Sequence, residues 1–268
     1  MKPPLGVALS YAATIRAWLE QFQAHILETV LPGWERNRVA FGGQLASSQS
    51  KFDTSDFIGK KIAGIKVELE QRLDPAKLSP QIAKFAKRVA TKNGEECRRV
   101  IGISTGDTGL KSTLDRFQDR NVDLITSLAG KQIDDIRGIL EDAEIGAWRV
   151  EDLSAKIQAS FGVNQSKADL LARDQVLKLN GQLTQTRQQN AGVSKYIWTT
   201  VGDERVRGNP TGKNPDGLHY ELDGTVQSWA VPPTISEDGR TGHPGDDYQC
   251  RCTAFPVLEE LDEGPADE

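Results

Sequence analysis

The sequence predicts a mainly α-helical protein with a small α+β domain at its C-terminal end. Through the first two-thirds of the 268 residues, apolar side chains recur every three or four positions, as on one face of an α-helix. After Gly192 a β-branched and aromatic run at residues 196–201 is followed by frequent Gly, Pro, Asn and Asp, which is typical of short strands joined by turns. We therefore expect a helical N-terminal region, then a long helix packed on a short, loop-rich β region at residues 193–257.

The first predicted helix carries one continuous apolar stripe. Its members are Ala8, Ala12, Ile15, Leu19, Phe22, Ile26 and Val30. Pro32 follows the stripe, and we expect it to end the helix because proline lacks a backbone N–H and its ring obstructs the preceding turn. A second helix is predicted by another apolar stripe, made of Ile58, Ile62, Ile65, Leu69 and Leu73.

Local signals predict where the next helices begin. Ser79 and Pro80 are suited to the N-cap and the first helical position, so a third helix is expected to begin there. The Gly/Ser/Thr-rich residues 105–113 predict a loop or hinge. Helical periodicity then resumes at residues 114–140.

The last helical stretch is expected to consist of two helices. A shorter amphipathic helix is predicted around residues 153–161. Ser166, followed three residues later by Asp169, matches a capping box and predicts a new helix start. Gly192 is expected to stop this second helix.

Composition and charge exclude some classes of protein. The chain is 37% hydrophobic and 26% charged, and its mean hydropathy is -0.48. Apolar runs stay shorter than the roughly 18 residues of a membrane-spanning helix, so no membrane partner is expected. Arg16 and Glu20 interrupt the apolar patch near the N-terminus, so we expect no signal peptide and synthesis in the host cytoplasm.

Charge is distributed unevenly along the chain. The net charge is -5, but residues 60–99 hold eleven bases against five acids, whereas residues 258–268 hold six acids and form an acidic tail. Two interpretations of the basic segment stay open. It is either the ordinary charge of solvated helix faces or a surface that binds double-stranded DNA through phosphate contacts.

The chemistry of the C-terminal region centres on two cysteines. Cys250 and Cys252 flank Arg251, so on a strand both thiols would point to one face. His219 and His243 would complete a Cys₂His₂ set for zinc, although structural zinc sites usually have wider Cys spacing. In the alternative interpretation, the cysteines are small buried apolar side chains or a disulfide partner, and His219 bonds a loop carbonyl.

An ordered series of short motifs occupies residues 172–257. These are Ala172-Arg173-Asp174-Gln175, Lys178-Leu179-Asn180, Arg187-Gln188, Asp203-Glu204-Arg205-Val206-Arg207, His219, Leu222-Asp223-Gly224, His243-Pro244-Gly245-Asp246 and Cys250-Arg251-Cys252-Thr253. This order resembles the Mu F-like family of phage minor head, or head morphogenesis, proteins. A turn-rich insertion at residues 208–217 departs from the family pattern by separating Arg207 from His219.

The resemblance implies a domain organisation and a function. It implies a Mu F-like domain at residues 111–257, helical at 111–192, preceded by a helical region at 1–110 of unknown role. It also implies a structural component of the virion in the capsid interior, with the portal protein as partner and with the major capsid protein, scaffold proteins or packaged DNA as further candidates. These implications rest on analogy with the family.

An enzymatic function is the alternative that the same segment raises. Asp203 with a downstream histidine could serve a metal-dependent nuclease or a nucleotide-modifying domain. No common nucleotide-binding or hydrolase motif accompanies it, so we predict no catalytic residues and no enzyme. We expect Asp203 instead to pair with Arg205 or Arg207, and Tyr196, Trp198 and Trp229 to pack beneath the loops.

Overall fold

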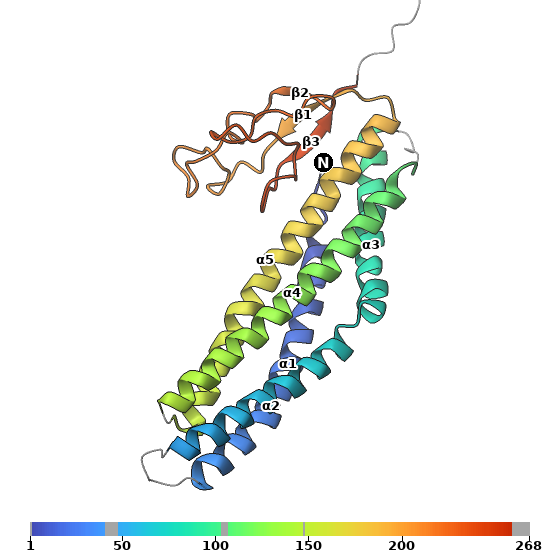
Figure 1. Ribbon diagram of the computed structural model, residues 1–268. Coiled ribbons are helices and arrows are strands. Elements are labelled where there is room, and N and C mark those ends of the chain that lie inside the picture. The colour runs from blue at the N-terminus through green and yellow to red at the C-terminus, as the bar shows by residue number, and fades with distance from the viewer. Residues whose placement is uncertain (1, 41–47, 103–106, 147, 259–268) are drawn as a thin grey trace, which may run out of the picture. The chain divides into compact units, whose positions relative to one another are not determined.

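The computed structural model describes residues 2–40, 48–102, 107–146 and 148–258. It contains five helices followed by three short strands (Figure 1). The helices are α1 Leu5–Ala40, α2 Ser48–Arg72, α3 Pro75–Ile101, α4 Leu110–Ile145 and α5 Val150–Asn190, and the strands are β1 Lys195–Thr199, β2 Val226–Ser228 and β3 Thr253–Pro256. The predicted fold class, mainly α with a small C-terminal β region, is confirmed.

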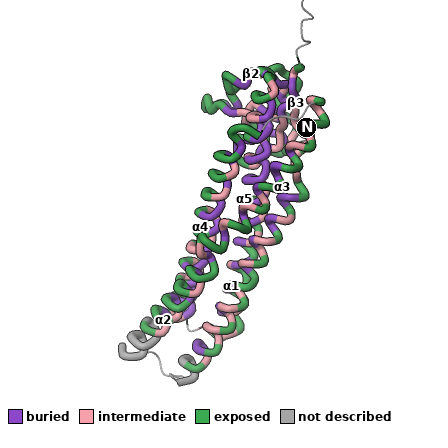
Figure 2. The backbone as a smooth tube through the Cα atoms, turned by 90° about the vertical axis from the view of Figure 1, so that its right-hand side faces the viewer, coloured by how far each residue is buried: buried purple, intermediate pink, exposed green. Residues whose placement is uncertain are grey.

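The chain forms two compact units. The helical unit comprises residues 9–82 and 119–172, and the sheet unit comprises residues 1–8, 83–118 and 173–268. Buried positions recur along the helices, as the apolar stripes of the sequence predict (Figure 2). Within the described residues, no helix is both long and apolar enough to span a membrane.

Pro32 does not end the first helix. The helix continues past it to Ala40, so that prediction is wrong. A proline inside a helix removes one backbone hydrogen bond, but packing on both sides holds the helix together here. Val30 and Trp34 are buried, and the Trp34 indole N–H donates to the carbonyl of Trp148.

The predicted start of the third helix at Ser79 is also wrong. Asp74 and Pro75 provide the same kind of signal earlier in the chain, and α3 begins at Pro75. The Asp74 carboxylate accepts a hydrogen bond from the backbone N–H of Ala76 at 2.9 Å, as an N-cap does. Pro80 therefore lies inside the helix.

The two helices predicted before Gly192 are one helix, α5. Ser166 lies in its interior, where its hydroxyl donates to the carbonyl of Gly162 at 3.3 Å, a bond that a continuous helix accommodates. Asp169 does not close a capping box and instead pairs with Arg16 of α1 at 2.6 Å. The buried side chains of Phe161, Asn164 and Ala168 continue one buried face through the predicted break.

Other predicted boundaries agree better with the structure. Helix α5 ends at Asn190, and Gly192 has a φ of 79°, the left-handed conformation that commonly follows a helix end. The loop predicted at residues 105–113 overlaps the α3–α4 connection, although α4 already begins at Leu110. Residues 105 and 106 of the predicted loop, and residues 259–268 of the acidic tail, lie outside the described residues.

The sheet is antiparallel, with β1 in the centre and the order β2-β1-β3. Tyr196 and Trp198 point from β1 to the same side, where they form a small core with Trp229, Ile235 and Ala254. This confirms that the three aromatic residues pack beneath the loops. The sheet is too small to bury much area by itself, so its attachment to α5 matters for its stability.

Gln188 fastens this core to α5. Its fully buried amide donates to the carbonyl of Ala254 and accepts from the indole N–H of Trp229, both at 3.0 Å. Next to Gln188 on α5, the buried Arg187 guanidinium donates to Asn93 of α3 at 2.7 Å. Asn93 in turn donates to the side chain of Asn180 at 3.0 Å. Gln188, Arg187 and Asn93 therefore hold α3, α5 and the sheet together.

Candidate metal centre

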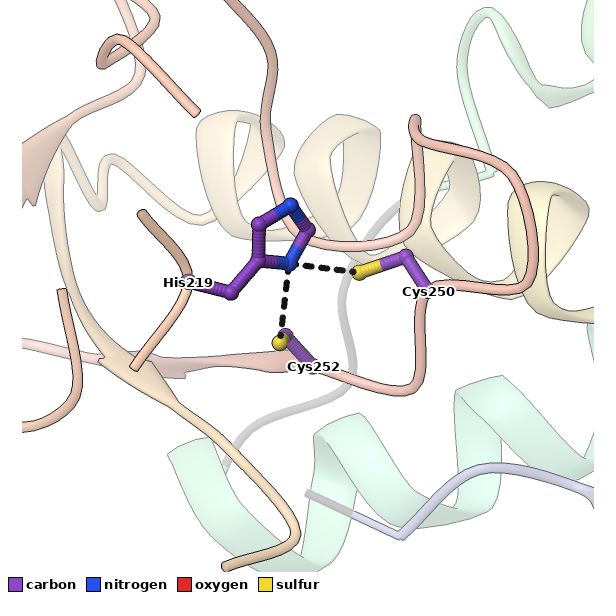
Figure 3. A group of neighbouring side chains, drawn as sticks. All are labelled: His219, Cys250 and Cys252. Atoms are coloured by element: carbon purple, nitrogen blue, oxygen red, sulfur yellow. Dashed lines mark hydrogen bonds between the residues drawn. The ribbon is translucent and has the colours of Figure 1, made fainter. Parts of the chain in front are cut away.

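Three of the four predicted metal ligands meet in the sheet unit (Figure 3). The Nδ1 atom of His219 lies 3.6 Å from Sγ of Cys250 and 3.5 Å from Sγ of Cys252. All three ligand atoms lie within 4.8 Å of one another, and His219 and Cys250 are buried. Among the described residues, this is the one group of at least three His, Cys, Asp or Glu side chains close enough to share an ion.

His243 is placed elsewhere in the same unit. Its Nδ1 lies 2.9 Å from the hydroxyl of Tyr196, and its ring packs against Trp229 at a centroid distance of 4.9 Å. Burial lowers the pKa of His243, which favours its neutral form. The structure therefore brings together Cys250, Cys252 and His219, and leaves His243 out of the group.

An unusual backbone conformation orients Cys250. The preceding residue, Gln249, has a φ of 55°, a left-handed conformation that non-glycine residues rarely adopt. Two residues of helix α5 hold Gln249 in this conformation. The backbone N–H of Gln249 donates to Asp174 at 2.7 Å, and its side-chain oxygen accepts from Arg173 at 2.5 Å. The Arg-Asp pair of the family motif therefore sets the direction of the Cys250 loop.

The same loop makes a close backbone contact with α5. A Cβ atom at Gly181 would lie 2.4 Å from the carbonyl oxygen of Pro244 and 3.4 Å from the Cα of Gly245. Gly245 has a φ of 100°, which favours glycine there too. The two glycines allow the His-Pro-Gly-Asp segment to lie directly on the helix, and this contact positions the loop that carries Cys250 and Cys252.

His219 is fixed despite the insertion that precedes it. Its neighbour Tyr220 donates its backbone N–H to the carbonyl of Arg207 at 2.9 Å, which ties the two ends of residues 208–217 together. The Nε2 atom of His219 lies 3.4 Å from a carboxylate oxygen of Asp247. Arg207 and Arg240 both pair with Asp247, so Arg207 and His219 face the same carboxylate.

The two thiols differ in acidity. A hydrogen bond from Cys252 and the nearby His219 lower the pKa of Cys250 well below its ordinary value, despite burial. The hydrogen bond to Cys250, together with burial, raises the pKa of Cys252. The two shifts belong to the coupled pair, and together they make loss of a first proton easier and loss of a second proton harder.

Arg251, between the two cysteines, binds a carboxylate outside the group. It donates to both oxygens of Asp203, at 2.5 and 2.6 Å, and this holds the pKa of Asp203 well below its usual range. The predicted pairing of Asp203 with Arg205 is present at 3.3 Å, whereas Arg207 pairs with Asp247 instead. Asp203 is therefore part of a framework around the cysteines.

A small cavity adjoins the group. It has a volume of about 160 Å³ and is lined by His219, both cysteines and four arginines: Arg173, Arg205, Arg207 and Arg251. This volume admits water or a small anion. Arg205 and Arg251 pair with Asp203, and Arg207 pairs with Asp247, so much of the positive charge of this lining is compensated.

Sequence reasoning missed several residues that shape this centre. Asp247, Trp198 and Gly181 were not singled out as its supports. Gly181 gave a signal, since a glycine in the middle of a predicted helix often marks a close backbone approach. Asp247 had none beyond its position in a Gly-Asp-Asp turn.

Comparison with known proteins confirms the resemblance to the Mu F-like family. Residues 134–255 match the family model described as Phage Mu protein F like protein, a range that includes His219, Cys250 and Cys252. The chain is also 35% identical over 139 residues to an uncharacterized protein of Haemophilus influenzae. That match covers 52% of this chain and 28% of the relative, so this chain spans little more than a quarter of the relative's length. No solved structure matches the chain.

Proposed function

We propose that this protein acts in phage head morphogenesis, as a minor structural component of the capsid interior that binds the portal protein. The match of residues 134–255 to the family described as Phage Mu protein F like protein carries the proposal. The described residues support a structural role. The buried hydrogen bonds of Gln188 and Arg187 in the sheet unit stabilise the attachment of the sheet to α5 and to α3.

Co-purification tests this function. The full chain, tagged and co-expressed with the portal protein of the same genome, should recover the portal, and virions purified from that phage should contain the chain. Co-expression with the major capsid protein alone provides the comparison for portal specificity. Absence of the chain from virions, together with failure to recover the portal, would exclude the proposal.

A second candidate function is DNA binding through residues 60–99, and one surface favours it. Lys84, Lys87 and Arg88 are exposed on α3 at spacings that place them on neighbouring positions of one helix face. Several other bases in the segment are already paired within their own helices, such as Lys92 with Glu95 and Arg99 with Glu96. Lys84 and Lys87 are therefore the exposed bases of this face at which we test DNA binding.

The salt dependence of binding tests this second function. If the three bases contact phosphates, affinity for any duplex should fall steeply with salt, and each charge removed should lower the slope of log K against log salt by about 1. Reversing Lys84 and Lys87 to Glu should weaken binding, whereas Lys111→Glu on α4 should have little effect. Equal effects of both changes, or no salt dependence, would exclude specific use of this surface.

A further inference from the structure

The spacing of the three ligand atoms is that of a tetrahedral zinc site. With Zn–S bonds of about 2.3 Å and Zn–N bonds of about 2.05 Å, a tetrahedron separates nitrogen and sulfur by about 3.6 Å. The observed separations from His219 Nδ1 are 3.6 Å to Cys250 and 3.5 Å to Cys252. A single ring nitrogen carries one proton or one lone pair, so it cannot make two good hydrogen bonds with both sulfurs. One ion between the three atoms accounts for both distances.

Each of the three ligands also has an outer partner suited to a metal-bound form. The backbone N–H of Gly245 faces the sulfur of Cys250 and contributes to lowering the pKa of this thiol. The buried indole N–H of Trp198 has no conventional acceptor among the described residues, but it interacts with the sulfur of Cys252. Metal-bound thiolates commonly accept such N–H groups, and these partners orient the ligands.

Asp247 supplies the corresponding partner for the histidine. If Nδ1 binds the ion, the proton of His219 lies on Nε2, which is buried, lacks a hydrogen bond of ordinary geometry and lies 3.4 Å from the Asp247 carboxylate. A carboxylate in this position fixes the tautomer and orientation of a metal-binding histidine. Asp247 is itself held by Arg207 and Arg240.

Charge compensation and ligand type favour zinc. Two thiolates, one buried and one partly buried, would repel each other, whereas a divalent cation neutralises both. Two thiolates and one imidazole in a tetrahedral arrangement are the ligand type and geometry of zinc sites. His243 does not compete for the fourth position, because its Nδ1 bonds Tyr196 and its ring also interacts with the backbone of Trp229.

We propose that the chain binds one zinc ion through Sγ of Cys250, Sγ of Cys252 and Nδ1 of His219, with the fourth position taken by water or a small anion. The cavity of about 160 Å³ that the three ligands line, with its four arginines, accommodates such a fourth ligand. The ion joins the turn at residue 219 to the start of β3, and so fixes loops that have little apolar core of their own. This proposal does not depend on the proposed function in head morphogenesis.

Metal analysis of the full-length chain tests the proposal. The purified wild-type chain should contain one zinc ion, and the metal-free chain should take up one cobalt ion with the intense visible absorption of a tetrahedral site with thiolate ligands. Cys250→Ser, Cys252→Ser and His219→Gln should each lose the ion or greatly weaken its binding. Cys97→Ser and His243→Gln are the matched controls and should keep it, because Cys97 is a buried cysteine of α3 and His243 lies outside the group.

Three results would overturn the proposal. The first is a folded wild-type chain that binds neither zinc nor cobalt. The second is loss of the ion in His243→Gln as in the ligand variants, which would indicate a different ligand set. The third is a disulfide between Cys250 and Cys252 in the purified chain. Under non-reducing conditions the chain would then have a mass two hydrogens below that of the reduced chain. Because the cobalt spectrum is measured on the wild-type chain, the test does not depend on whether the variants fold.

Discussion

Replacing Gly181 with alanine should destabilise the protein through a single backbone contact. The added Cβ would lie 2.4 Å from the carbonyl oxygen of Pro244, closer than real Cβ contacts, and the obstacle is backbone that cannot simply rotate away. Such overpacking costs about 1–3 kcal/mol, whereas exchanging glycine for alanine inside a helix gains about 1 kcal/mol. We therefore expect a net loss of up to about 2 kcal/mol in the free energy of unfolding.

Gly162 provides a matched control on the same helix. A Cβ there would meet nothing within 4 Å, so Gly162→Ala should gain the helix propensity without the clash. Both variants share the gain in helix propensity, so it cancels when their free energies of unfolding are compared. The remaining difference should be about 1–3 kcal/mol. Urea unfolding followed by far-UV circular dichroism measures it. Equal shifts of the two midpoints would refute the reasoning that the loop lies on α5 at Gly181.

Three further substitutions test other contacts. Gln188→Ala removes the partner of the Trp229 indole N–H and of the Ala254 carbonyl, so the free energy of unfolding in urea should fall by roughly 2–5 kcal/mol. Gln189→Ala, at an exposed position, should change it by less than about 0.5 kcal/mol. Asp203→Asn should lower the melting temperature near neutral pH. Pairing with Arg251 depresses the pKa of Asp203 in the folded state, so the pair stabilises the fold fully above the unfolded pKa of about 3.9. This stabilisation is lost as pH falls further. The difference in melting temperature between the variant and the wild type should therefore shrink below about pH 4. A difference that is constant with pH would contradict this pairing. Asp247→Asn should weaken zinc binding by about 10–100-fold in a chelator competition, because Asp247 faces His219. Asp238→Asn also loses a bond to Arg240, but Asp238 does not face His219, so zinc affinity should stay unchanged.

The sequence determined the helices because their apolar periodicity reports which side of each helix is buried. It did not determine where the helices end, because local signals compete. Asp74 with Pro75 and Ser79 with Pro80 are equivalent capping signals in the sequence. Helix α3 begins at the first, and Leu78 in its first turn is buried. Ser166 resembles a cap, but its neighbours Asn164 and Ala168 are buried and keep α5 continuous.

For the candidate centre, the sequence determined the ligand types and only the tertiary structure selected the set. Cys250 and Cys252 are separated by one residue, so their proximity follows from spacing alone. His243 is near the cysteines in sequence and His219 is farther away, so spacing does not select His219. The turn tied to Arg207 directs His219 toward the cysteines, whereas Tyr196 and Trp229 hold His243 away. The physical reason is that a short-range pattern encodes which groups can bind a metal, whereas loops packed on a distant helix decide which of them meet.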